Sequence, residues 1–169
     1  MYRTIVRIIA ALGLAAFQLP TAFAQNCDLL GQPVALTAAG TPTPMNSVVQ
    51  SGSVEFNSMP NDGRFSVNVE STTIRMFNNT AAQTIMFNSG AAPYTVTFSQ
   101  LQASITGVSV TVNGVTGLAA NAVSFTANSV TIAPANSVWN GGNNIVITLQ
   151  TVCPPSSAPI FRNGFEASP

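Results

Sequence analysis

The side chains in this sequence that could carry out chemistry are few, and neither histidine nor lysine is among them. The absence of histidine excludes Ser-His-Asp and Cys-His nucleophile systems, histidine general bases and histidine metal ligands. The absence of lysine excludes Ser-Lys dyads, Schiff-base chemistry and the lysine of a phosphate-binding loop. We therefore expect a protein that is not an enzyme and that uses no cofactor.

Three carboxylates in the middle of the chain, Glu55, Asp62 and Glu70, remain for acid-base work. A glycosidase needs two carboxylates that face each other across a cleft. Alternation within the neighbouring strand-like runs instead points both Glu55 and Glu70 toward water. One carboxylate in the loop at Asp62 is too little for calcium, which takes about six to eight oxygen ligands. We interpret all three as solvated carboxylates without a metal, and a carboxylate-based glycosidase is the less favoured alternative.

The single tryptophan, Trp139, stands next to amide side chains at Asn140, Asn143 and Asn144. Exposed aromatic rings beside amide groups are typical of sugar-binding sites, where the ring stacks on the sugar and the amides bond to its hydroxyls. Lone tryptophans are more often well buried, so a ring that closes the end of the core is the favoured interpretation. A carbohydrate-binding module with a glycan partner is the alternative.

Hydroxyl side chains recur on three of the expected strands, which could place them in one flat array like those of ice-binding surfaces. β-propensity alone explains these residues, so an ordinary wet sheet face is the favoured interpretation. The residues are Thr95, Thr97, Ser109, Thr111 and Thr131.

The two cysteines, Cys27 and Cys153, stand at the two ends of the patterned part of the chain. In an oxidising compartment we expect them to form one disulfide. Two free buried thiols, or pairing with another chain, are the alternatives.

Residues 1–24 have the pattern of a secretory signal peptide. Arg3 and Arg7 precede an apolar run over 8–17, and a small-x-small pattern ends at Ala24. The apolar run is short for a membrane span, so an uncleaved anchor helix is the less favoured reading. We expect cleavage before Gln25 and export to the periplasm, the cell surface or the medium.

The part of the chain that follows this leader carries three arginines against five carboxylates. So little positive charge cannot release many counterions from a phosphate backbone, which argues against nucleic acid as a partner. Anionic membrane surfaces are disfavoured for the same reason, and no further run has the length of a membrane span.

Apolar and polar residues alternate with a period of two in about nine short runs, as half-buried strands require. In 64–70, Phe65, Val67 and Val69 are expected to face the core while Ser66 and its alternating neighbours face water. Turn residues separate the runs and no sustained helical period appears. The expected fold of 25–153 is all-β, an antiparallel sandwich of jelly-roll or immunoglobulin-like type, with an up-and-down barrel as the alternative. The runs are 48–56, 64–70, 72–77, 83–87, 94–98, 108–112, 122–125, 130–132 and 145–152.

After Cys153, residues 154–159 are rich in proline and serine and favour an extended linker. The segment 160–169 that follows is apolar and aromatic again but too short to form a core. One interpretation is a sorting or interaction tail that export or surface-assembly machinery binds, and the alternative is a terminus without a function of its own. The residues concerned are Ile160, Phe161, Arg162, Asn163, Gly164, Phe165 and Glu166.

This tail resembles a C-terminal Ile-Phe-x-Asp/Asn-Gly-Phe-Glu signature that ends many otherwise unrelated exported proteins of some Gram-negative bacteria. The middle of the chain, from Thr95 through 105–108 to 124–130, is similar to uncharacterised exported β-sandwich domains. The resemblance implies export and brings no catalytic residue. Together, the sequence favours a non-catalytic surface or extracellular structural or interaction module.

Overall fold

The computed structural model describes residues 27–39, 41, 43–59, 63–101 and 103–153. The expected signal peptide at 1–24, the linker at 154–159 and the tail at 160–169 lie outside these residues. The described chain forms eleven strands and no helix. They are β1 (Pro33–Ala38), β2 (Met45–Val48), β3 (Phe65–Val69), β4 (Thr73–Asn78), β5 (Ile85–Met86), β6 (Tyr94–Phe98), β7 (Ser104–Asn113), β8 (Val123–Phe125), β9 (Ser129–Ile132), β10 (Val138–Trp139) and β11 (Asn144–Val152).

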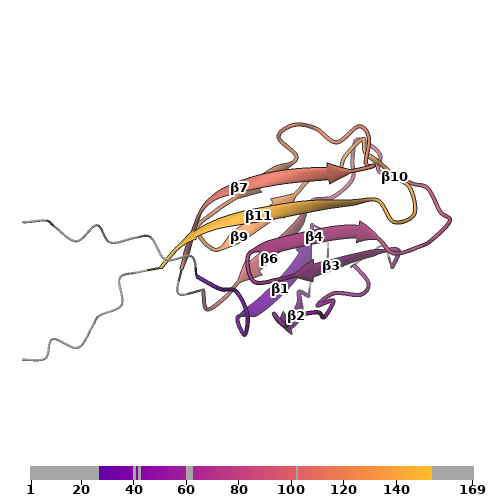
Figure 1. The fold of residues 1–169 in the computed structure, drawn as a ribbon. Helices are drawn as coiled ribbons and strands as arrows, with labels where there is room; N and C mark the ends of the chain where they lie inside the picture. The colour runs from indigo at the N-terminus through magenta and orange to yellow at the C-terminus, as the bar shows by residue number, and fades with distance from the viewer. Residues whose placement is uncertain (1–26, 40, 42, 60–62, 102, 154–169) are drawn as a thin grey trace, which may run out of the picture.

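The strands form two main antiparallel sheets that share one core (Figure 1). The five-stranded sheet has the order β2-β1-β6-β9-β8, and the four-stranded sheet has the order β3-β4-β11-β7. The short strands β10 and β5 pair with each other. The prediction of an all-β antiparallel fold is confirmed, with eleven strands rather than about nine, and the jelly-roll or immunoglobulin-like type stays a prediction.

The core is built by period-two alternation in both sheets. On β6, Tyr94, Val96 and Phe98 are buried, and on β11 Ile145 and Ile147 are buried, each separated by more exposed residues. Full burial of one such aliphatic or aromatic side chain contributes about 1.5–3 kcal/mol of hydrophobic stabilisation. The core-facing residues predicted on β3 also lie in this cluster, so the predicted phase of that strand is confirmed for its apolar positions.

Three strands, β1, β2 and β10, were not predicted, and one predicted strand is wrong. The missed strand β1 begins at Pro33, and a proline is tolerated at the first position of a strand although it weakens the sequence signal. The missed strand β10 has only two residues. The segment predicted as a strand over 48–56 contains instead the end of β2, a turn with Gly52 at φ 71°, and a single bridge from Phe56 to Val67.

Ser66 was predicted to face water, and this prediction is wrong because Ser66 is buried. The segment leading to Met59 runs along β3 and covers it, with the Met59 N–H donating to the carbonyl of Phe65 at 3.0 Å. The Ser66 hydroxyl donates to the carbonyl of Asn57 at 2.8 Å, and Asn79 Nδ2 donates to the Ser66 hydroxyl at 2.9 Å. Ser66 is therefore covered by the neighbouring segment, whereas alternation alone predicted that its side chain would face water.

Candidate functional site

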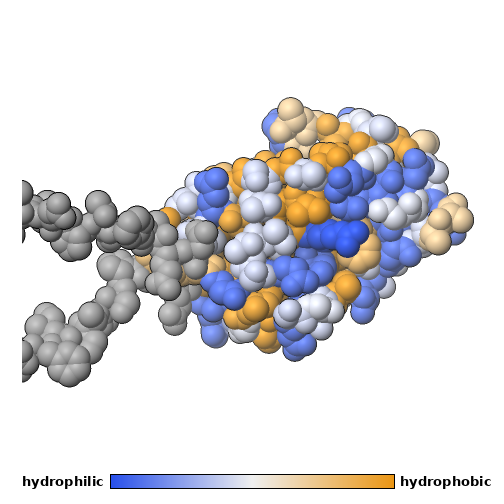
Figure 2. Space-filling model, viewed as in Figure 1, coloured by the Kyte–Doolittle hydropathy of each residue, from blue (hydrophilic) through white to orange (hydrophobic). Residues whose placement is uncertain are grey.

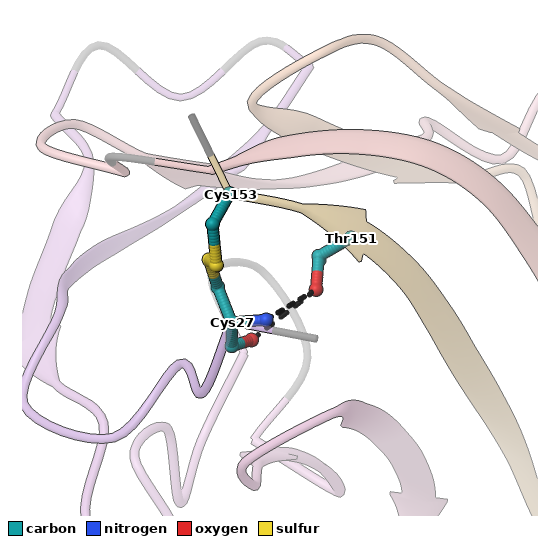
Figure 3. Close-up of a disulfide and its surroundings, with 3 residues drawn as sticks. All are labelled: Cys27, Thr151 and Cys153. Atoms are coloured by element: carbon teal, nitrogen blue, oxygen red, sulfur yellow. Dashed lines mark hydrogen bonds between the residues drawn. A yellow bond between two sulfur atoms is a disulfide. The ribbon is translucent and has the colours of Figure 1, made fainter. Parts of the chain in front are cut away.

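The two ends of the described domain meet at one pole, which we call the disulfide pole. Cys27 and Cys153 form a disulfide with a Cα–Cα distance of 5.7 Å, as predicted (Figure 3). The Thr151 hydroxyl accepts a hydrogen bond from the Cys27 N–H and donates one to the Cys27 carbonyl, both at 3.2 Å. Because one hydroxyl serves both backbone groups, Thr151 acts as a strand partner for Cys27 next to the covalent bridge. The sequence gives no local signal for this role of Thr151.

Trp139 lies at the other end of the sandwich, where it is fully buried at 0% exposure. Its ring packs edge-on against Phe65 at 5.1 Å and against Phe87 at 6.3 Å between ring centroids. Its Nε1 donates to the Ser137 hydroxyl at 2.7 Å, and that hydroxyl donates to the Pro134 carbonyl. The favoured interpretation, a ring that closes the core, is confirmed. Burial removes the stacking platform on which the sugar-site hypothesis depends.

The three asparagines near Trp139 bond to the protein itself. Asn140 Oδ1 accepts from the Thr84 hydroxyl at 2.7 Å, and Asn143 Nδ2 donates to the Gly114 carbonyl at 2.7 Å. Asn144 Oδ1 accepts from Asn113 Nδ2 at 2.9 Å. The Asn143 and Asn144 bonds join the chain just before β11 to the end of β7, and the Asn140 bond joins the loop after β10 to the residue before β5. We therefore interpret these amide groups as structural.

Glu55 does not point freely into water, and its predicted solvated orientation is wrong. Its Oε1 accepts from the Gln50 N–H at 3.0 Å and its Oε2 accepts from the Val69 N–H at 2.7 Å. The alternation argument failed because the chain around Glu55 is not a strand. Glu70 accepts from Asn68 Nδ2 at 3.0 Å. Asp62 lies outside the described residues. Glu55 and Glu70, the two described residues of this set, therefore make structural bonds within the protein.

The hydroxyl array predicted as an alternative is divided between the two sheets. Thr95 and Thr131 are paired neighbours in the five-stranded sheet, and their hydroxyls lie 3.0 Å apart. Ser109 and Thr111 lie on β7 of the four-stranded sheet. The five residues therefore do not form one face, and the ordinary interpretation of wet strand positions holds.

The remaining unusual surface is the edge formed by β7 and β8. Figure 2 shows hydrophobic residues gathered along β7. Val110 and Val112 lie in the same phase as the buried residues Ile147 and Ile145 opposite them on β11, yet they are 40% and 44% exposed. A groove of about 210 Å³ opens beside them. Its lining is Val110, Val112, Leu118, Ala119, Ala120, Ala122 and Val123.

Comparison with known proteins gives no relative: no family model, curated protein or solved structure matches the chain. Within the described part of the chain, no helix has the length and apolar character needed to cross a membrane. Nor do the described residues contain three or more cysteine, aspartate or glutamate side chains grouped as metal ligands would be.

Proposed function

We propose that this chain is a non-catalytic, exported structural or interaction module, held at its disulfide pole and presenting the rest of its surface to partners. The observation that carries the proposal is the covalent connection of Cys27 to Cys153 at one end of the sandwich. Disulfides form and persist mainly in oxidising compartments, which supports export. The leader pattern at 1–24 supports the same location.

The position of the bridge also supports a role in presenting the surface of the domain to partners. The described domain begins at Cys27 and ends at Cys153, so the disulfide joins its two ends, and a pull applied between these ends is borne by the bridge rather than by the sheets. The bridge closes a loop over a sequence separation of 126 residues. The opposite pole and the edge of β7 are then free to meet partners, while the segment after Cys153 connects the module to export or surface-assembly machinery.

The state of the described carboxylates supports a non-catalytic role. A nucleophilic or general-base carboxylate must reach a substrate, whereas both oxygens of Glu55 accept backbone N–H groups. Glu70 bonds to the side chain of Asn68 two residues away. Neither arrangement leaves a pair of carboxylates poised across a cleft, as glycoside hydrolysis requires.

An epitope inserted at a surface turn tests this proposal. Ser89 lies in an exposed turn where the Gly90 N–H donates to Asn88 Oδ1, and the turn is far from the disulfide pole because it precedes the Ala38-paired end of β6. Antibody should bind this epitope on intact producing cells, in the medium or in the released periplasmic fraction. Binding only after the cytoplasmic membrane is broken would contradict the proposal. A matched epitope at Gln100, which follows the other end of β6, reports on access near the disulfide pole.

The tail is tested separately by ending the chain after Ala158. We expect the same melting temperature, because no described core residue is removed. We expect less of the truncated protein at the location of the full chain, if machinery recognises 160–166. Equal amounts at the same location would exclude a sorting role for the tail.

A further inference from the structure

The edge of β7 is an unpaired strand edge of unusual length. On one side β7 pairs with β11 along the whole of Ser104–Asn113, and among the described residues no strand pairs with its other side. The Ile105 N–H donates to the Ala127 carbonyl at 2.8 Å, so the free stretch begins after Ile105. Thr106 is an extra residue opposite the Gln150/Thr151 step, a bulge that ends regular pairing there. The regular, free stretch is therefore 107–113.

The other edges of the two sheets are protected, whereas β7 is not. The edge of β3 is covered by the segment that contains Phe56 and Met59, and the edge strands β2 and β8 have only four and three residues. Proteins usually protect a long edge with charges, a proline or a covering segment. β7 contains no charged residue and no proline. All charged residues of the described chain lie between Asp28 and Arg75.

The sequence of β7 is self-complementary. Apolar and hydroxyl side chains alternate along residues 108–112, and the order is the same from either end: Val108, Ser109, Val110, Thr111, Val112. When two such strands pair antiparallel about Val110, valine lies opposite valine and hydroxyl lies opposite hydroxyl. Both kinds of cross-strand pair are favourable, and no like charges meet.

We propose that the β7 edge pairs with the β7 edge of a second copy of this chain, in a symmetric dimer with one continuous eight-stranded sheet. This inference deepens the proposed function, on which it rests, by naming a partner. Edge-to-edge strand addition supplies backbone hydrogen bonds, and a two-fold axis makes the same patch serve both copies. The half-exposed Val110 and Val112, together with the open groove beside them, then meet their symmetry mates.

The size of the contact predicts a reversible dimer. Seven residues of strand extend about 24 Å, and the edge of a two-sheet sandwich with its outer side chains is about 20 Å tall. The buried surface is then about 500 Å² per copy, or about 1,000 Å² in total, at the lower limit for a specific interface. The dimer should therefore dissociate on dilution. Because the edge is uncharged, added salt should not weaken it.

The test is sedimentation of the exported protein over a dilution series, with two matched variants. Val110→Lys places a charge in the middle of the proposed contact. Val152→Lys makes the same change at a valine of the same 40% exposure, at the disulfide pole. The unmodified protein and Val152→Lys should change from dimer to monomer on dilution, whereas Val110→Lys should be a monomer throughout. Melting temperatures show whether both variants are folded.

Hydrogen exchange of the unmodified protein gives a second measurement that needs no variant. Protection of amides in 107–113 should rise with protein concentration. A monomer at every concentration, a dimer that Val110→Lys leaves intact, or exchange in 107–113 that is independent of concentration would overturn the proposal. If truncation after Ala158 abolished the dimer, the segment that binds the β7 edge would be the tail of a neighbouring copy and not its strand β7.

These outcomes are separable from a failure of the proposed function. A protein that is exported with an accessible Ser89 epitope but stays monomeric contradicts the dimer alone. A protein found only inside cells with reduced cysteines contradicts the proposed function, whatever its mass in solution.

Discussion

The Thr151 hydroxyl lies 3.2 Å from both the backbone nitrogen and the carbonyl oxygen of Cys27, a residue 124 positions away in the sequence. Thr151 is buried, and its strand β11 pairs with β4 and β7 in the four-stranded sheet. The first described residue is therefore attached to a central strand twice, by this hydroxyl and by the disulfide to Cys153. The two attachments can be separated by mutation.

Replacement of both Cys27 and Cys153 by serine should lower the free energy of unfolding by up to about 5 kcal/mol, the chain-entropy value for a loop of this size. Thr151→Val keeps the bridge and leaves two backbone groups of Cys27 without their partner. Its expected cost is about 1–3 kcal/mol. Denaturant unfolding measures both values. A larger effect from Thr151→Val than from the double cysteine variant would show that the bridge contributes little.

Pulling the chain by its two ends should extend only the segments outside the bridge while the disulfide is intact. After reduction, unfolding should add about 430 Å of contour length, because 126 residues are released. Single-molecule force spectroscopy with and without reductant measures this difference. Full-length extension of the oxidised protein would show that load passes through the sheets.

Phe65→Asp should prevent folding, because it places a charge in the core beside Trp139. Ser66→Asp should also be destabilising, by about 3 kcal/mol or more, since Ser66 is buried under the segment that contains Asn57. Thr148→Asp on the exposed face of the same sheet is the control and should change stability by about 0.5 kcal/mol or less. Thermal unfolding would refute this burial if Ser66→Asp behaved like the control.

The fluorescence of the single tryptophan should report a buried ring. Trp139 has 0% exposure, so acrylamide should quench it weakly until the protein unfolds. Adding simple or polymeric sugars should not shift its emission. Strong quenching of the native protein, or a saturable shift with a sugar, would restore Trp139 as a ligand-binding residue.

Much of the fold follows from local patterns, because alternation in β6 and β3 reflects which side chains the core buries. The same patterns did not predict β1, in which Pro33 and two alanines weaken the strand signal. They also assigned Ser66 and Glu55 to water, since the segment that covers β3 is a tertiary contact. For the candidate functional site, too, local patterns predicted only the features that do not depend on tertiary contacts. The disulfide was predictable from compartment and cysteine count, whereas the role of Thr151 and the uncovered edge of β7 required the arrangement of the sheets.

Mass spectrometry of the protein isolated from its producing cells tests the central claim most directly. Non-reducing peptide mapping of the fraction outside the cytoplasm should find a chain that begins at Gln25 and a peptide pair linked through Cys27 and Cys153. A chain that retains residues 1–24 and carries two alkylatable thiols, recovered from the cytoplasm, would contradict the account of an exported module held at its disulfide pole.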